Sequence, residues 1–518
     1  MSGLAIRNFA NADALGDVFY NGGVPYDKNG ALLVAAEMSG VLRRALLVGD
    51  SITAQAEVTL ATATPYVVDN GDGTLTVTRT SHSAHVGEPV RITAAPSASL
   101  NLMDGEILSI VDANNIKCTI QGRTHGVTSV ASASVAFPNR RSSRGWYSWL
   151  ETLLGEMFST TWCAVGGARI ANLTTLVQDS DAGPHDVGFV CAGMNDIYAD
   201  GNSLATLQAD MTALLALVAA RSQKVVLLSV PPRNSADASW SAGKQTIHTQ
   251  FNRWLYEFAK ANNLIFVNTW RATANATTYI NSGATEPDPT ASFSFDNTHP
   301  SSVGAYAVGL AVKTAIQDFL GVRGWSPSHV DDLGADAGNI FTNSNFATDT
   351  AGVPTSWAQS DTTASSTVGN SVAARTVAAD GDALGKNAVI TYNYGTATGT
   401  ASTRFRRNNF HASVTAGDYC QLRVPFSVAN AAGLLGIELC MFGTDADGTF
   451  WQVYGNNLDT NADPHTDTPI SGVLMTPPAI IPAGLSDLDC WVRIYITSAQ
   501  SSDVTVKLWH PVLRTWAA

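Results

Sequence analysis

Five short apolar runs alternate with longer segments of helical period between residues 42 and 321. This alternation constrains the possible folds more than any other feature of the sequence. The runs are residues 44–49, 161–166, 187–193, 224–230 and 264–269. Each is apolar or β-branched throughout and bounded by glycine or polar residues, which is typical of strands buried on both faces. The helical segments are residues 145–156, 203–222, 242–263 and 301–321. The alternation predicts a three-layer α/β domain over residues 41–321, built on a parallel sheet.

Residues 56–143 interrupt this domain with a different texture. They are rich in Thr, Val and Ser, lack a helical period and contain the hairpin signals "DNGDGT" and "MDGE". We predict an inserted β module. The module leaves the α/β layers just after Ser51 and returns just before the helix near Trp146. It must therefore lie beside the site that contains Ser51.

The two ends of the chain differ from its centre. Residues 1–40 read as a short extended lead-in, and residues 322–337 read as a linker. Residues 338–518 contain many short alternating strands with polar turns, which predicts a β-sandwich. A chain of 518 residues exceeds what one hydrophobic core usually serves, so several domains are expected.

Charge and composition exclude several classes of partner. A net charge of −13 argues against nucleic acid, whose phosphates require clustered Lys and Arg. No run of about 18 apolar residues is evident, so no membrane partner is expected. The first residues lack the basic start and apolar core of a secretory signal. We expect a soluble protein without an export signal.

The six cysteines are scattered, without a C-x-x-C pair. A disulfide framework, a metal site or a bound cofactor is therefore not expected. A single disulfide among Cys420, Cys440 and Cys490 stays open.

Four polar stretches each follow an expected strand or precede an expected helix. They are "GDSI" at residues 49–52, "VGGARI" at 165–170, "AGMND" at 192–196 and "DNTHP" at 296–300. The carboxyl ends of parallel strands form the edge where ligands bind. Gly-Asp-Ser alone is a common turn or helix cap. All four stretches in this order and at these junctions favour a catalytic site.

Ester hydrolysis needs a nucleophile, a base, a group that orients the base and donors for the oxyanion. Ser51 supplies a hydroxyl, while Asp296 and His299 lie three residues apart in one loop. One turn can thus provide both the base and its carboxylate. The amides of Ser51 and Gly167 and the side chain of Asn195 are suitable oxyanion donors.

The four stretches together resemble the SGNH (GDSL-like) hydrolase family over residues 41–321, apart from the insertion. The resemblance implies a flavodoxin-like fold, Ser51 as nucleophile, His299 as general base and Asp296 as its partner. It also implies Gly167 and Asn195 as oxyanion donors. Asp50 and Asp196 would then be supporting hydrogen-bonding residues. The second stretch departs from the family pattern, because it reads "AVGGA" without the family's preceding Asn.

Two further similarities bear on the substrate. The stretch "NIFTNSNFATDTAGVPTSW" is similar to the start of jelly-roll carbohydrate-binding modules, in which Trp357 and Trp451 would either stack on sugars or pack in the core. The stretch "VGEPVRITAAPSASLNLMDGEILSIVDANNIKCTI" in the insertion is similar to small β modules of bacteriophage tail and bacterial surface proteins. We expect an O-acetylesterase acting on an acetylated bacterial polysaccharide. A general esterase or lipase, and a phage receptor-binding protein with a degenerate hydrolase, are the alternatives. Homo-oligomerisation and attachment to a virion tail stay open.

Overall fold

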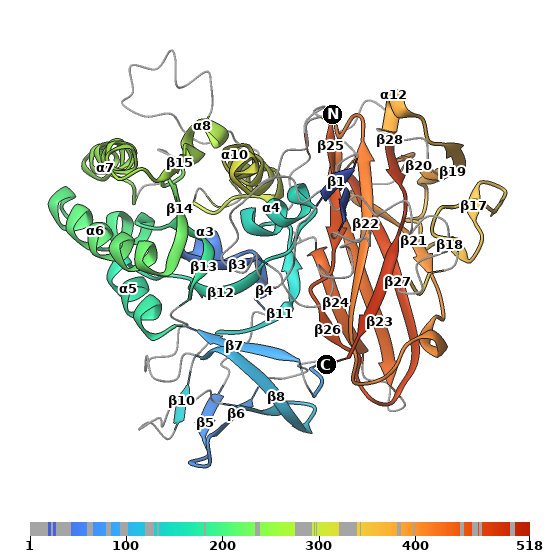
Figure 1. Ribbon diagram of the computed structural model, residues 1–518, viewed down its shortest axis with the longest axis horizontal. Coiled ribbons are helices and arrows are strands. Elements are labelled where there is room, and N and C mark those ends of the chain that lie inside the picture. The colour runs from blue at the N-terminus through green and yellow to red at the C-terminus, as the bar shows by residue number, and fades with distance from the viewer. Residues whose placement is uncertain are drawn as a thin grey trace.

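The computed structural model of this chain contains one five-stranded parallel sheet (Figure 1). Its strands are β3 (Arg44–Gly49), β12 (Ser159–Ala164), β13 (His185–Cys191), β14 (Ser222–Leu228) and β15 (Ile265–Val267). Their order, β12-β3-β13-β14-β15, is 2-1-3-4-5 in chain order. That is the flavodoxin-like order, so the predicted fold class is confirmed.

The structure describes most of the chain. The described residues are 19–21, 24–26, 43–59, 66–78, 84–86, 88–93, 102–119, 129–131, 134–180, 183–233, 239–274, 293–294, 296, 298–320, 339–341, 343–380, 385–396, 399–445, 450–457, 465, 469–497 and 503–517. The predicted linker, residues 322–337, lies outside them. In the predicted lead-in, only β1 (Phe19–Asn21) and β2 (Val24–Tyr26) are described, and they form an antiparallel pair.

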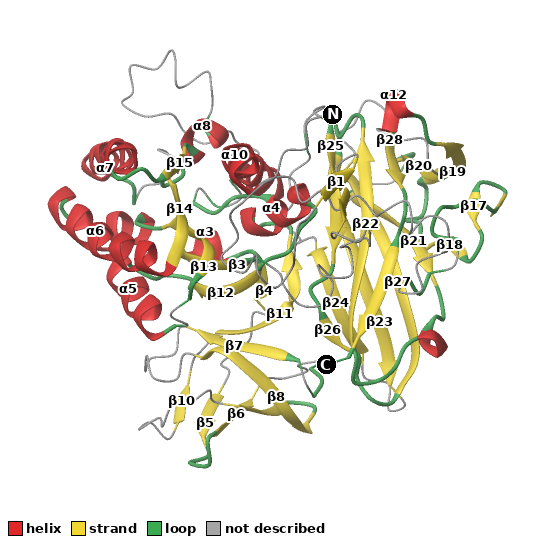
Figure 2. Cartoon of the chain, in the orientation of Figure 1, coloured by secondary structure: helices red, strands yellow, loops and turns green. Residues whose placement is uncertain are grey.

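Helices cover both faces of the parallel sheet, which makes three layers (Figure 2). They are α4 (Trp146–Leu154), α5 (Ile170–Asp179), α6 (Leu204–Arg221), α7 (Ala242–Ala261), α8 (Thr269–Thr273) and α10 (Ser302–Leu320). Helices α4 and α10 pack together on one face, and α5, α6 and α7 pack in sequence on the other. The spacing of apolar residues in α6 explains why the helix packs on the sheet, because Leu207, Met211 and Leu214 are all buried against it.

Two details of the α/β domain differ from the sequence prediction. Strands β12, β13 and β14 begin and end two residues earlier than the apolar runs suggest. After β12, Val165 already starts a tight turn in which the Ala168 amide donates to its carbonyl. Helix α5 was not predicted, because its exposed positions leave only Ile170, Leu173 and Val177 as a sparse buried stripe.

Helix α6 is long and apolar enough to cross a membrane by length and composition alone. It is not a continuous run of apolar residues, because Gln208, Asp210 and Arg221 lie within it. The helix nevertheless contacts α5, α7, β13 and β14, which gives its apolar side a partner within the α/β domain.

The segment between Ser51 and Trp146 is built from strands. It contains β4 (Glu57–Thr59), β5 (Tyr66–Asp69), β6 (Thr74–Thr78), β7 (Pro89–Thr93), β8 (Leu102–Asp112), β9 (Asn115–Thr119), β10 (Ser129–Ala131) and β11 (Ser134–Ser142). The Ser142 amide donates to the Ala56 carbonyl at 3.0 Å, so the segment leaves and re-enters the α/β domain at one point. A side chain at Gly145 would collide with Ala56 there.

The C-terminal part is an antiparallel β-sandwich, as predicted. One sheet contains β18 (Trp357–Ser360), β21 (Thr400–Arg407), β23 (Leu434–Asp445), β24 (Phe450–Asn457) and β27 (Leu485–Thr497). The other contains β19 (Thr367–Ala374), β20 (Lys386–Asn393), β22 (Tyr419–Val428), β25 (Ile470–Met475), β26 (Ala479–Ile480), β28 (Val504–Leu508) and β29 (Val512–Trp516). The short pair β16 (Asp349–Thr350) and β17 (Val353–Pro354) and the short helix α12 (Val377–Asp380) lie outside these sheets.

Three sequence alternatives are decided in this sandwich. Cys420, Cys440 and Cys490 are buried and none of them forms a disulfide, so the disulfide that stayed open is absent. Trp451 is fully buried, and Trp357 stacks on Phe405 with ring centroids 4.8 Å apart. Both tryptophans therefore pack in the core, and the sugar-stacking alternative is wrong for them.

The inserted strands and the sandwich share one continuous sheet. Strand β11 pairs in parallel with β24, with Arg140 opposite Tyr454 and Ser142 opposite Asn457. This pairing joins segments about 300 residues apart in the chain, and Figure 1 shows the two parts side by side. The pairing also protects edges of both parts that would otherwise expose unpaired backbone groups.

The sandwich also shares a hydrophobic core with helices α4 and α10. Trp149 and Leu153 of α4 belong to the same buried cluster as the sandwich interior. Trp149, Tyr306 and His465 meet edge to face, with ring centroids 5.3 to 5.8 Å apart. Burial lowers the pKa of His465 to about 4, so its ring is neutral at pH 7.

Deleting residues 338–518 is expected to destabilise the α/β domain. The deletion would expose Trp149, Leu153 and Tyr306, each contributing about 2 kcal/mol of burial. We expect a melting temperature about 10 °C lower, or aggregation, measured by circular dichroism on the truncated and full chains. A truncated chain that melts at the temperature of the full chain would contradict the shared core.

Candidate active site

Ser51 lies where strand β3 turns into a single helical turn, α3 (Ser51–Ala54). The Asp50 carboxylate accepts the Ile52 amide at 3.1 Å and so caps this turn. Gly49 is required before it, because a β-carbon there would collide with Thr53 and lie 2.7 Å from the Cys191 carbonyl oxygen. The turn therefore holds the serine hydroxyl at the switch point between β3 and β13, where ligands bind in this fold.

His299 and Asp296 lie in a turn just before helix α10. One oxygen of the Asp296 carboxylate accepts the backbone amides of Thr298 and His299 at 3.0 and 2.7 Å. Its other oxygen lies 2.6 Å from His299 Nδ1. This arrangement fixes the ring, so that Nδ1 donates and Nε2 is left to accept.

The imidazole reaches the serine. His299 Nε2 lies 2.8 Å from Ser51 Oγ, across 248 residues of sequence. The three predicted residues Ser51, His299 and Asp296 thus form one hydrogen-bonded chain from hydroxyl to carboxylate. This is the geometry that a nucleophile, a general base and an orienting carboxylate require.

The electrostatics of Asp296 suit the role of the carboxylate that orients the base. Burial raises its pKa, but the hydrogen bonds from the His299 ring and from the His299 and Thr298 amides outweigh burial. Together they bring the pKa of Asp296 to about 2. The carboxylate is therefore ionised at pH 7, and it can stabilise a positive charge on His299.

The predicted oxyanion donors lie on the neighbouring strand ends. Gly167 follows β12 with φ of 76°, a conformation that favours glycine, and it is exposed. Asn195 follows β13, and its Nδ2 donates one proton to the Ala168 carbonyl at 3.1 Å, which leaves a second proton free. That bond ties the loop of Gly167 to the loop of Asn195. A β-carbon at Gly166, the residue before Gly167, would lie 4.0 Å from that of Ser51.

The two predicted supporting carboxylates are buried behind these loops. Asp196 accepts the Ile170 amide at 3.2 Å, so it anchors the start of α5 beside Gly167. Burial raises the pKa of Asp196, and burial raises that of Asp50 to about 6, with the charge of Asp196 adding to the effect.

The raised pKa of Asp50 predicts a pH-dependent stability. Between pH 3.8 and about 6 the folded state binds more protons than the unfolded state, so stability falls as the pH rises through this window. A shift of about two pKa units corresponds to about 3 kcal/mol. Asp50→Asn removes the ionisable group. The melting temperature of this variant, relative to that of the wild type, should therefore rise from pH 4 to pH 8. A difference that is constant or shrinks over this range would contradict the buried charge.

Sequence reasoning missed one group at this rim. Arg233 follows β14, the next strand along the sheet, and its side chain is buried and bonded to Thr298. The stretch "PPRNS" offered a signal only through its position after a strand. No metal-binding cluster of His, Cys, Asp or Glu occurs among the residues that the structure describes.

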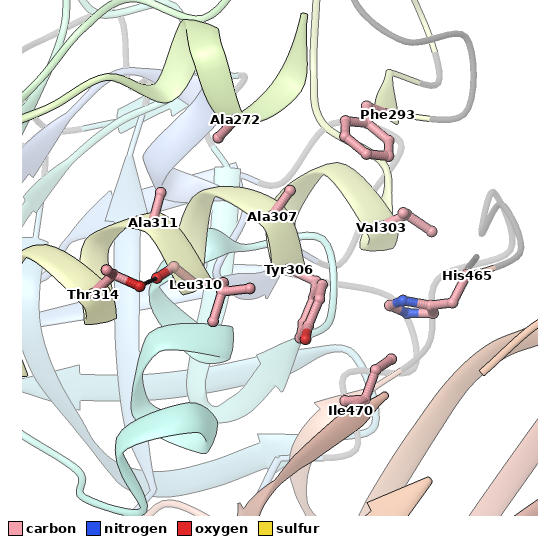
Figure 3. A pocket seen from close by; sticks show the side chains of 10 residues that line it. All are labelled: Ala272, Phe293, Val303, Tyr306, Ala307, Leu310, Ala311, Thr314, His465 and Ile470. Atoms are coloured by element: carbon pink, nitrogen blue, oxygen red, sulfur yellow. Dashed lines mark hydrogen bonds between the residues drawn. The ribbon is translucent and has the colours of Figure 1, made fainter. Parts of the chain in front are cut away.

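A separate cavity of about 480 Å³ lies along α10 (Figure 3). It is lined mainly by apolar side chains, among them Phe293, Leu310 and Ile470, and also by Tyr306 and His465. None of the predicted site residues lines it. The cavity therefore does not belong to the Ser51 site.

The fold and the hydrogen-bonded chain define a flavodoxin-like α/β domain with a Ser–His–Asp arrangement at its switch point. Residues 124–307 match the model of the GDSL-like Lipase/Acylhydrolase family. The chain thus carries a domain of this family, and it is a carboxylic ester hydrolase. The match begins inside the inserted strands, so the Ser51 stretch lies outside it. The contact with His299 is what connects Ser51 to the matched part.

Solved structures show distant likenesses. A GDSL-like lipase from Bacteroides thetaiotaomicron is 18% identical, with 31% of this chain and 76% of that chain covered and a TM-score of 0.27. The acetylxylan esterase of Geobacillus stearothermophilus is 15% identical, with 53% and 94% covered and a TM-score of 0.28. No curated protein matches the chain. The family match, and not these likenesses, identifies the domain.

Proposed function

We propose that Ser51 is the nucleophile of this ester hydrolase, with His299 as general base and Asp296 as its orienting carboxylate. The observation that carries the proposal is the 2.8 Å contact between His299 Nε2 and Ser51 Oγ. His299 takes the proton of Ser51 while Oγ attacks the ester carbonyl. The tetrahedral intermediate then expels the alcohol, which receives that proton from His299. Water activated by His299 releases the acid from the acyl-serine and restores Ser51.

The oxyanion of that intermediate would accept hydrogen bonds from the amides of Ser51 and Gly167 and from Asn195 Nδ2. The bond from Asn195 to the Ala168 carbonyl supports this role, because it fixes the side-chain amide while leaving one N–H to donate. Donors held in place before the reaction need no reorganisation as the charge develops.

The substrate we propose is an acetyl ester on a polysaccharide. The rim is open: the side chains of His299 and Asp296 are 24% and 39% exposed, and Gly166 and Gly167 are exposed. An open rim suits an ester that projects from a long polar polymer. The apolar cavity beside α10, the kind of space that a long acyl chain would need, is not lined by Ser51 or His299.

Two alternatives from the sequence receive less support. A lipase acting on long acyl chains would need an apolar surface next to Ser51. A receptor-binding protein with a degenerate hydrolase would need no assembled triad, whereas His299 lies within hydrogen-bonding distance of both Ser51 and Asp296. Attachment to a virion tail rests only on the similarity of the inserted segment to phage tail modules.

Acetate release from a panel of acetylated polysaccharides tests the substrate class. Acetylated xylan and acetylated bacterial capsules serve as polymers, and 4-nitrophenyl acetate, butyrate and octanoate serve as a chain-length series. We expect release from at least one polymer and the highest kcat/KM on the acetate ester, both lost in Ser51→Ala. Preference for the octanoate would support the lipase alternative, and wild-type protein inactive on every ester would support the degenerate one.

A further inference from the structure

Arg233 lies at the same rim as the proposed catalytic residues but has no place in the reaction described so far. Strands β3, β12 and β13 are followed by Ser51, Gly167 and Asn195, and β14 is followed by the loop of Arg233. The Arg233 side chain is only 7% exposed, although it carries a charge. A charged group is rarely buried to this extent unless its partners satisfy it.

The guanidinium of Arg233 connects two parts of the site. Nη1 donates to the hydroxyl of Thr298, which lies inside the turn between Asp296 and His299. The guanidinium carbon lies 3.8 Å from the ring centroid of Tyr198 and 5.6 Å from that of Trp240. Tyr198 belongs to the short π-helix Asp196–Asp200, which begins directly after Asn195. One side chain thus touches both the loop of the base and the helix beside the oxyanion donor.

The turn that carries His299 needs such an outside contact. The Asp296 carboxylate binds the amides of Thr298 and His299 and the imidazole, but all of these bonds lie within the turn. They fix its shape and leave its position relative to Ser51 to other contacts. Positional errors of about 1 Å in a catalytic group can cost on the order of 100-fold in rate.

We propose that Arg233 is a positioning residue for this reaction. Through Thr298 it holds the turn at the place where His299 Nε2 reaches Ser51 Oγ, and its stacking on Tyr198 keeps that turn in register with Asn195. This inference rests on the proposed function. An arginine suits the role because its planar group stacks on an aromatic ring while its N–H groups donate at the edge, whereas lysine offers only a point charge.

The test compares kcat and KM on 4-nitrophenyl acetate for Arg233→Met, Arg233→Lys, Thr298→Val and the double variant Arg233→Met/Thr298→Val. We expect each single variant to lower kcat about 10- to 100-fold with little change in KM. The double variant should be no slower than the slower single variant, because both changes break one connection. Thr298→Ser keeps the hydroxyl and should restore most of the activity.

Lys244→Met is the matched control. The Lys244 ammonium also lies over the Tyr198 ring, at 5.1 Å, but it bonds to the carbonyls of Tyr198 and Ser239 and not to the catalytic turn. It should keep the wild-type kcat. Melting temperatures of all variants identify any loss of folding, in which case Thr298→Val alone decides the outcome.

Three results would overturn the inference: a kcat of Arg233→Met equal to that of the wild type, a loss confined to KM, or losses that multiply in the double variant. Ser51→Ala measured in the same assay separates the two proposals. If Ser51→Ala were as active as the wild type, the proposed function would fail. If Ser51→Ala were inactive while Arg233→Met and Thr298→Val were unaffected, only the role of Arg233 would fail.

Discussion

Ser51→Ala is expected to lower kcat on 4-nitrophenyl acetate by about 10⁴- to 10⁶-fold. Ser51 Oγ is the only atom of the proposed triad that forms a bond to the substrate, and alanine has no atom in its place. The rate that remains would come from the oxyanion donors acting on a water molecule. Initial rates measured over a wide range of enzyme concentration will distinguish this remaining activity from background hydrolysis.

Two comparisons make this result specific. Ser413→Ala changes an exposed serine of the sandwich and should keep the full rate. His299→Ala should lose about as much activity as Ser51→Ala, and combining the two should cost little more, because the pair acts as a unit. A Ser51→Ala protein that keeps a tenth or more of the wild-type kcat at an unchanged melting temperature would contradict the assignment.

Asp296→Asn is expected to lower kcat by about 10⁴-fold. Asparagine can still accept the backbone amides of Thr298 and His299, so the turn should keep its shape. Its NH₂ group would face His299 Nδ1, where the carboxylate oxygen now lies 2.6 Å away. The ring would then place its proton on Nε2, the atom that has to accept the proton of Ser51.

Asp200→Asn is the matched control for Asp296→Asn. Asp200 is also a carboxylate near the rim, and it pairs with Arg169 away from the triad. Its variant should stay within about twofold of the wild-type rate, since a single ion pair of this exposure contributes little. Equal losses in the two variants would show that charge near the rim, and not the His299 tautomer, controls the rate.

The sequence predicted the α/β domain well because its signals are local. A strand buried on both faces is apolar throughout, and a helix on a sheet has a regular apolar stripe, so β3 and α6 were recognised within a few residues. The approach of His299 to Ser51 could also be predicted, because the carboxyl ends of parallel strands meet at one rim whatever their separation in sequence. Ser51 and His299 therefore meet across 248 residues.

Contacts between distant side chains could not be predicted in the same way. The pairing of β11 with β24 is an example, because an alternating pattern predicts a strand but not which other strand pairs with it. Trp149 looked like any apolar position of an amphipathic helix, yet it packs into the sandwich core. Arg233 offered no pattern at all, because its importance comes from Thr298 and Tyr198, which lie far from it in sequence.

The central claim is that the Ser51 hydroxyl is the activated nucleophile of the site. Treatment of the full chain with a fluorophosphonate, followed by mass spectrometry of its peptides, tests it without any assumption about the natural ester. We predict one covalent label, on Ser51, formed in step with the loss of esterase activity and strongly slowed in His299→Ala. A label on another residue, or complete inactivation with Ser51 unmodified, would contradict it.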